Sequence, residues 1–137
     1  MYIFTNGYPE IRIKLDNGVY IFDAKSSTGK TYLAILLKRL RGAGEPVDSF
    51  TYADSKRVNT LTEALSGKDF TVQQLRVIML DRYDMYSDLY VDELDKLREN
   101  CVILIDCKWG ARIRNTRRCY ATLTSDSIEV TPGALYL

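Results

Sequence analysis

The segment that most constrains the fold is a short apolar strand, a polar loop and an amphipathic helix in direct succession. Residues 19–22 (VYIF) are continuously apolar, as in a strand that is covered on both faces. Residues 23–28 are polar, and four leucines then recur at helical spacing over residues 30–41. These are Leu33, Leu36, Leu37 and Leu40. A strand that leads directly into a helix predicts a βα unit, and therefore an α/β domain.

The remaining patterns extend this prediction to the whole chain. Residues 10–15 alternate in polarity and are predicted to form a hairpin with residues 19–22 around Asp16-Asn17-Gly18. We expect further strands at 47–53, 77–80 and 102–105, helices at 54–65 and 87–100, and a closing hairpin of 120–123 with 128–131. This order predicts one domain over residues 1–137, with a largely parallel central sheet, helices on both faces and antiparallel hairpins at its edges.

The loop before the first long helix has the chemistry of a phosphate site. The amides of a helix N-terminus are unpaired and carry partial positive charge, so they attract anions. Gly29 lets the backbone approach an anion without a Cβ in the way. Lys30 supplies an ammonium for the outer phosphates, and Thr31 offers a hydroxyl to Mg²⁺.

Residues 24–31 (AKSSTGKT) resemble the Walker A motif of P-loop NTPases, G-x-x-x-x-G-K-[ST], with Ala24 in place of the first glycine. The resemblance implies a three-layer P-loop NTPase-like fold, similar to a minimal AAA-family ATPase core without its helical lid. It also implies that ATP or another nucleoside triphosphate is bound with Mg²⁺. The implied nucleotide-binding residues are Lys25, Ser26, Ser27, Thr28, Gly29, Lys30, Thr31 and Tyr32.

Two apolar runs end in an aspartate, as the Walker B strand of the same family does. They are VIML before Asp81 and VILI before Asp106. In the AAA-like branch, the order of the strands would make Asp81 the Mg²⁺ residue together with Thr31, and Asp106 a sensor of the γ-phosphate. In kinase-like branches the assignment could differ, and strand ends are commonly polar in proteins without this function.

The position after Asp81 departs from the ATPase pattern. The family usually has a glutamate there that polarises the attacking water, whereas this chain has Arg82, which cannot act as a base at neutral pH. Asp84 could substitute for that base, although Asp-Arg-Tyr-Asp is also typical of a solvated turn. The sequence therefore predicts nucleotide binding with slow hydrolysis at most.

A basic stretch over residues 108–118 supports three interpretations. Its cations are Lys108, Arg112, Arg114, Arg117 and Arg118. By resemblance to AAA-like ATPases, Arg117 and Arg118 precede the fifth strand and would act as catalytic arginines that reach the γ-phosphate of a neighbouring subunit. Alternatively, the stretch binds nucleic acid, with Trp109 and Tyr120 available for stacking. The third interpretation is a solvated loop.

Composition excludes several other classes. The 19 Lys and Arg residues nearly balance 18 Asp and Glu residues, so no global charge attracts nucleic acid or anionic lipid. The longest apolar runs are too short to span a bilayer, and the N-terminus lacks the order of a signal peptide. Three cysteines without a CxxC pair or any histidine argue against zinc, and we expect reduced thiols in the cytoplasm.

The sequence thus predicts a nucleotide-binding domain whose use of the nucleotide stays open. If it is an ATPase, Lys30, Asp81, Asp106, Arg117 and Arg118 would carry catalysis. The alternative is a non-catalytic accessory or nucleic-acid-interacting module of a phage or mobile element, and a small-molecule kinase is a third hypothesis. In the absence of a lid, the nucleotide would be more exposed, or a second copy or another protein would close over it.

Overall fold

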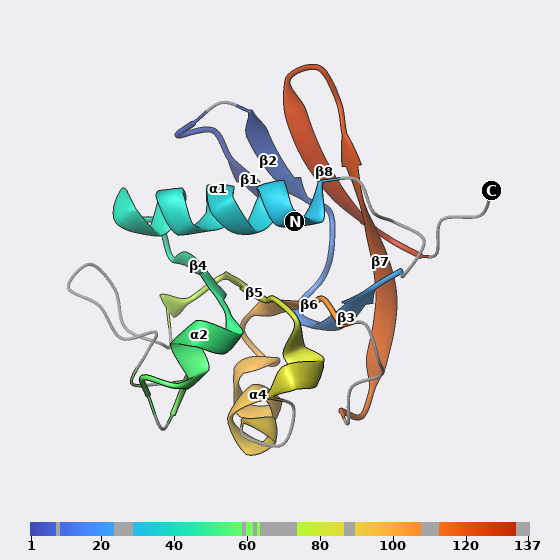
Figure 1. Cartoon of the computed structure of the whole chain (residues 1–137). Helices are drawn as coiled ribbons and strands as arrows, with labels where there is room; N and C mark the ends of the chain where they lie inside the picture. Colours follow the sequence, from blue (N-terminus) through green and yellow to red (C-terminus); the bar gives the residue numbers. More distant parts are fainter. Residues whose placement is uncertain are drawn as a thin grey trace.

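The computed structural model describes residues 1–7, 9–23, 29–58, 60–61, 63, 74–86, 90–107 and 113–133. Their strands form one curled, mixed sheet of eight, in the order β1-β2-β8-β7-β3-β6-β5-β4 (Figure 1). The strands are β1 (Tyr2–Phe4), β2 (Glu10–Ile13), β3 (Gly18–Phe22), β4 (Val47–Phe50), β5 (Val77–Leu80), β6 (Val102–Ile105), β7 (Thr116–Leu123) and β8 (Ser127–Pro132). The helices are α1 (Lys30–Gly42), α2 (Tyr52–Ser55) and α4 (Val91–Leu97), with a 3-10 turn, η2, at Tyr83–Met85.

One half of the sheet, here called the parallel strands, consists of β4, β5, β6, β3 and the first half of β7. Each of these strands pairs in parallel with its neighbour. Their register places Ile21, Ile105, Leu80 and Phe50 in one row. The residues that follow this row therefore meet at a single edge of the sheet, the edge formed by the carboxyl ends of the strands.

The other half, here called the outer strands, consists of β1, β2, β8 and the second half of β7. From Cys119 onward β7 pairs antiparallel with β8, β8 pairs in parallel with β2, and β2 pairs antiparallel with β1. β7 thus belongs to both halves, because its first residues pair with β3 and its last residues pair with β8.

Helix α1 lies on the inner side of the curl, between the two halves of the sheet (Figure 1). Its buried residues are the four leucines expected from the sequence, Leu33, Leu36, Leu37 and Leu40. They share one apolar cluster with Met79 and Leu104 of the parallel strands and with Ile13 and Val130 of the outer strands. The apolar stripe of leucines predicted for α1 is therefore confirmed. Both halves of the sheet pack against it.

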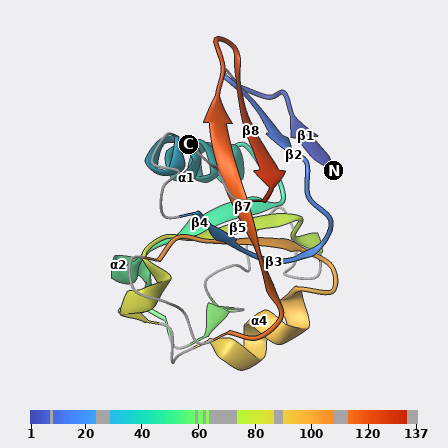
Figure 2. The ribbon, with the colours of Figure 1, turned by 90° about the vertical axis from the view of Figure 1, so that its right-hand side faces the viewer.

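The opposite face of the parallel strands is covered by α2 and α4 (Figure 2). A second apolar cluster joins Ile78, Leu80, Ile103 and Ile105 to Leu94 of α4. Tyr83, Tyr86, Tyr90 and Phe50 belong to the same cluster, where their rings meet edge to face at centroid distances of 5.4–6.2 Å. Tyr83, Tyr86 and Tyr90 are therefore core residues of this face.

The predicted three-layer P-loop NTPase-like domain, with a largely parallel sheet between helical layers, is wrong. The structure is a curled mixed sheet of eight strands, and its described helices have only 13, 4 and 7 residues. The physical reason is that strands, and not only the parallel sheet, cover the leucines of α1, so this helix is not the outer layer of the domain. Ile11 and Ile13 of β2 and Ile128 and Val130 of β8 lie in the same cluster as its leucines.

Several local expectations also change. The hairpin around Asp16-Asn17-Gly18 does not form, because β2 pairs with β1 and β8 while β3 pairs with β6 and β7. Asp54 is the third residue of α2 rather than its cap. The cap is Thr51, whose hydroxyl accepts from the Asp54 amide while Asp54 accepts from the Thr51 amide. The closing hairpin is confirmed as β7 and β8.

None of the described helices is long and apolar enough to cross a membrane.

Candidate functional site

The two predicted aspartates lie side by side at the carboxyl edge of the parallel strands. Leu80 pairs with Ile105, so Asp81 and Asp106, the next residues, occupy neighbouring positions at the ends of β5 and β6. The backbone hydrogen bonds between the strands continue through both residues, because the Asp81 amide donates to Phe50 O at 2.8 Å and the Asp106 amide donates to Leu80 O at 3.0 Å. The backbones of both residues are therefore fixed by the sheet.

β3 places the start of α1 beside this pair. It lies between β6 and β7, and Ile21 pairs with Ile105, so the chain leaves β3 next to Asp106. Gly29, the residue before α1, has φ 87°, a left-handed conformation that favours glycine. Gly29 has no side chain with which to cap this helix end, and the first turn of α1 contains no acidic residue. The partial positive charge of a helix N-terminus attracts anions.

Lys30 is the first residue of α1, and its side chain reaches the aspartate pair. Its Nζ donates to Asp106 Oδ1 at 3.1 Å, and both side chains are largely buried, at 19% and 18% exposed. Thr31 and Tyr32 follow in the first turn and are exposed. Of the predicted site residues, the structure therefore brings Lys30, Asp81 and Asp106 together and leaves Thr31 next to them in the chain.

The electrostatics of Asp81 differ from those of an ordinary surface carboxylate. Burial raises the pKa of Asp81, and the negative charge of Asp106 and a hydrogen bond with Asp106 raise it further. The cations Arg82 and Lys30 lower it in part. Among the described residues, two carboxylates therefore share one region with the Lys30 ammonium, and a further cation there would relieve their repulsion.

Tyr86 holds the end of β5 from the opposite face. Its hydroxyl lies 2.8 Å from the carbonyl oxygen of Asp81 and 3.2 Å from that of Phe50. The pKa of Tyr86 is raised well above its usual range, mainly by burial and then by the charge of Asp81, so the phenol stays protonated and donates. No local pattern in the sequence indicates this contact.

The segment after Asp81 does not present a free base. Arg82 adopts a left-handed conformation with φ 49°, and its guanidinium pairs with Asp84 at 3.2 Å. The Arg82 side chain is 42% exposed but that of Asp84 only 5%, so the solvated turn considered from the sequence does not extend to Asp84. Because Asp84 is held by Arg82, it is poorly suited to activate a water molecule.

Arg117 and Arg118 lie inside β7, which begins at Thr116, and not before the strand as predicted. Arg117 stacks on the ring of Tyr20, with its guanidinium carbon 4.8 Å from the ring centroid, and it points back toward Gly18. It therefore points away from Lys30. Arg118 pairs with Ile21, and its charge acts on the thiol of Cys107, the residue after Asp106. Of the two, Arg118 is the one near the aspartate pair.

Other predicted residues lie outside the described part of the chain. These are Ala24, Lys25, Ser26, Ser27 and Thr28 of the loop, and Lys108, Trp109 and Arg112 of the basic stretch. Arg114 is described and exposed, and its carbonyl oxygen accepts from Arg98 at 2.8 Å. The described basic residues thus do not form one continuous loop.

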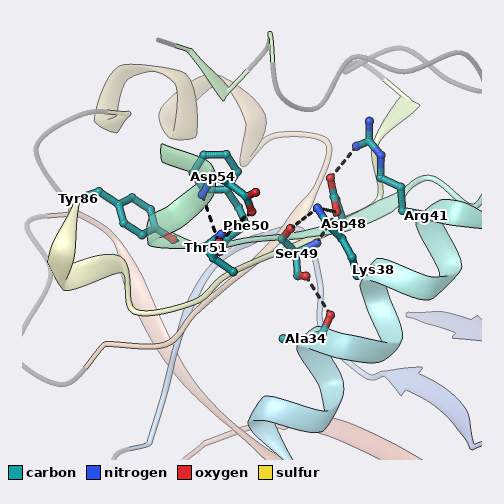
Figure 3. Close-up of polar contacts among 9 residues, drawn as sticks. All are labelled: Ala34, Lys38, Arg41, Asp48, Ser49, Phe50, Thr51, Asp54 and Tyr86. Carbon is teal, nitrogen blue, oxygen red and sulfur yellow. Dashed lines mark hydrogen bonds and ion pairs between the residues drawn. The ribbon is translucent and has the colours of Figure 1, made fainter. Parts of the chain in front are cut away.

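A buried polar cluster that the sequence analysis missed orients α1 (Figure 3). Asp48 of β4 is 3% exposed and accepts from Lys38 at 2.9 Å and from Arg41 at 2.7 Å. The hydroxyl of the neighbouring Ser49 donates to the carbonyl oxygen of Ala34 at 2.9 Å. The signal was an aspartate within the otherwise apolar strand VDSF, opposite a helix whose last turns carry cations.

Comparison with known proteins identifies no relative: no protein-family model matches the chain, and no curated protein matches it.

Proposed function

We propose that this protein binds a nucleoside triphosphate with Mg²⁺ at the start of α1. One observation carries the proposal: Lys30 is the first residue of α1, and its Nζ lies 3.1 Å from Oδ1 of Asp106, whose strand neighbour is Asp81. A helix N-terminus and an ammonium attract phosphate, while two adjacent carboxylates attract a divalent cation. These complementary charges suit a metal–polyphosphate complex.

The donor set at this edge fits Mg²⁺. Magnesium is usually bound by one or two carboxylates, and phosphates and water supply its other ligands. Asp81 and the Thr31 hydroxyl would hold it here. Among the described residues, no group of three or more His, Cys, Asp and Glu side chains is arranged to hold a metal. The proposed ion therefore depends on the nucleotide for part of its coordination. When bound, it would neutralise charge on the phosphates.

The chain's own residues favour binding over rapid hydrolysis. In an in-line attack by water, Lys30 would stabilise the charge that develops on the γ-phosphate. A general base would also have to hold the attacking water. Arg82 follows Asp81 and pairs with Asp84, so neither residue meets that requirement. This pairing favours the second candidate function, a nucleotide-binding module without catalysis.

The direct test is calorimetric titration with ATP, GTP and ADP in the presence of Mg²⁺. We expect the Lys30→Ala variant to lose at least about tenfold in affinity, because a hydrogen bond to a charged group contributes about 1.5–3 kcal/mol. Lys96→Ala, which removes the same charge from the exposed side of α4, is the matched control and should bind like the wild type. Equal affinity of the Lys30→Ala and wild-type proteins would refute the proposal.

Phosphate release, measured with and without DNA, separates the two functions. In the presence of a binding module, phosphate should be released no faster than by the spontaneous hydrolysis of the nucleotide in buffer alone. Sustained turnover that falls in Arg118→Ala would support the ATPase and would assign a role to the arginine of β7 that lies nearer the site.

A further inference from the structure

The ammonium that would bind phosphate already donates to a carboxylate. Lys30 Nζ donates to Asp106 Oδ1 at 3.1 Å, in surroundings that leave each side chain less than one-fifth exposed. Partial burial strengthens such a pair, because less water screens it. An incoming phosphate must therefore compete with Asp106 for Lys30.

The two partners differ in freedom. Asp106 is held by its main chain on both sides, since its amide donates to Leu80 O at 3.0 Å and its carbonyl oxygen accepts from the Tyr83 amide at 2.8 Å. Lys30 has a flexible four-carbon side chain at the end of a helix. Release of the pair therefore means movement of the lysine, while the carboxylate stays at the edge of the sheet.

The local charge explains what would release the lysine. Among the described residues, Asp81 and Asp106 place two acidic side chains beside the Lys30 ammonium, so a metal-free polyphosphate meets repulsion as well as competition. A divalent cation at the carboxylates opposes both effects. Metal and nucleotide would then strengthen each other's binding, and this coupling is reciprocal.

We infer that Asp106 acts as an internal competitor for Lys30, so that the site binds nucleotide weakly until a divalent cation occupies the carboxylate pair. This inference rests on the proposed function, and it adds a means of regulation to the same site. It also gives Asp106 a role that differs from γ-phosphate sensing.

The test compares wild type with Asp106→Asn, which keeps the size of the side chain and removes its charge. Acetylation of the Lys30 amine by an N-hydroxysuccinimide ester, followed by mass spectrometry, reports on the ion pair without any nucleotide. We expect Lys30 to react several-fold faster in Asp106→Asn. In EDTA, we expect this variant to bind ATP at least about tenfold more tightly than wild type, and Mg²⁺ should improve its ATP affinity less.

Glu99→Gln is the matched control. It removes one exposed carboxylate just before β6, at the opposite edge of the parallel strands, and should change neither measurement. Asp106→Ser is a second variant in case the asparagine impairs folding, which circular dichroism would reveal.

The outcomes distinguish the two claims. An unchanged acetylation rate of Lys30 in both Asp106 variants would overturn the claim that Asp106 competes for Lys30, whatever the ATP affinities of the variants. If wild type binds Mg–ATP but neither Asp106 variant binds metal-free ATP more tightly, the competition is also overturned while the nucleotide site stands. If no variant binds ATP under any condition, the proposed function fails and this inference fails with it.

Discussion

The parallel strands and the outer strands both cover α1, but they hold it by different interactions. The outer strands contribute apolar side chains, among them Ile11, Ile13 and Val130. The parallel strands contribute apolar side chains and also the buried Asp48 cluster, which binds Lys38 and Arg41 of the helix. Apolar contacts are not directional, whereas the polar cluster fixes the position of the helix along β4. Because Lys30 begins the same helix, the cluster also fixes where Lys30 meets Asp106.

The largest expected effect tests whether α1 is the shared core of both halves. Leu37 is fully buried in the cluster that joins them. We predict that Leu37→Ala lowers the free energy of unfolding by about 3 kcal/mol, through lost burial and the cavity left behind. Urea denaturation measures this value. Ile35→Ala, on the 46% exposed side of the helix, should cost clearly less, and equal losses would contradict this placement of α1.

The next effect tests the polar attachment to the parallel strands. Asp48→Asn weakens the hydrogen bonds from Lys38 and Arg41 and removes the buried negative charge that faces both cations. We predict a loss of about 2 kcal/mol in unfolding free energy. Asp95→Asn is the control, since Asp95 is 56% exposed and lies 3.7 Å from Arg98. It should change the free energy by less than about 0.5 kcal/mol, because exposed pairs contribute little. A similar result for both variants would show that the polar cluster does not hold the helix.

A smaller effect tests the outer strands. Ile13→Val removes one methylene group from a fully buried position on β2. We predict a loss of about 1 kcal/mol in unfolding free energy. We expect it to lower the affinity for Mg–ATP less than Asp48→Asn does, since Asp48 holds α1 by directional polar contacts with Lys38 and Arg41. A nucleotide affinity that falls with Ile13→Val as much as with Asp48→Asn would abolish the distinction between the two halves.

The smallest effect concerns the thiols. Burial raises the pKa of Cys101 and of Cys119 to about 12, so almost no thiolate is present in the folded protein at pH 8. Cys107 is half-buried at the carboxyl edge. We predict that Ellman's reagent modifies at most Cys107 in the native protein at pH 8, and all three cysteines after unfolding. Because these pKa values are raised, reactivity should increase as the pH rises. Rapid native modification of Cys119 would show that β7 does not shield the junction of the two halves.

The sequence predicted the local elements better than their partners. The leucine stripe of α1 and the buried runs before Asp81 and Asp106 are visible in the chain because burial imposes its period on neighbouring residues. Alternation in residues 10–13 shows that one face of β2 is buried, but it does not indicate that β8 is the strand beside it. The curl of the sheet over α1 depends on such distant pairings, and so the fold class was predicted incorrectly.

The same limit applies to the site. The sequence indicated Lys30, Asp81 and Asp106 one at a time, by their positions at the ends of a loop and two strands. The ion pair between Lys30 and Asp106 joins residues 76 positions apart, so no local pattern contains it. The pairing of Arg82 with Asp84 could have been predicted from the sequence, because the two residues are two positions apart and carry opposite charges. The position of Arg117 on Tyr20 again required the strand register.

The central claim is that the first turn of α1 and Lys30 bind the phosphates of a nucleotide. The most direct measurement is a proton–nitrogen correlation spectrum of the ¹⁵N-labelled protein during titration with Mg–ATP. We predict that the amide signals of Gly29, Lys30 and Thr31 shift the most, that Asp81 and Asp106 shift with them, and that the shifts vanish in Lys30→Ala. Amides at the start of α1 that stay unmoved at saturating Mg–ATP would contradict the account.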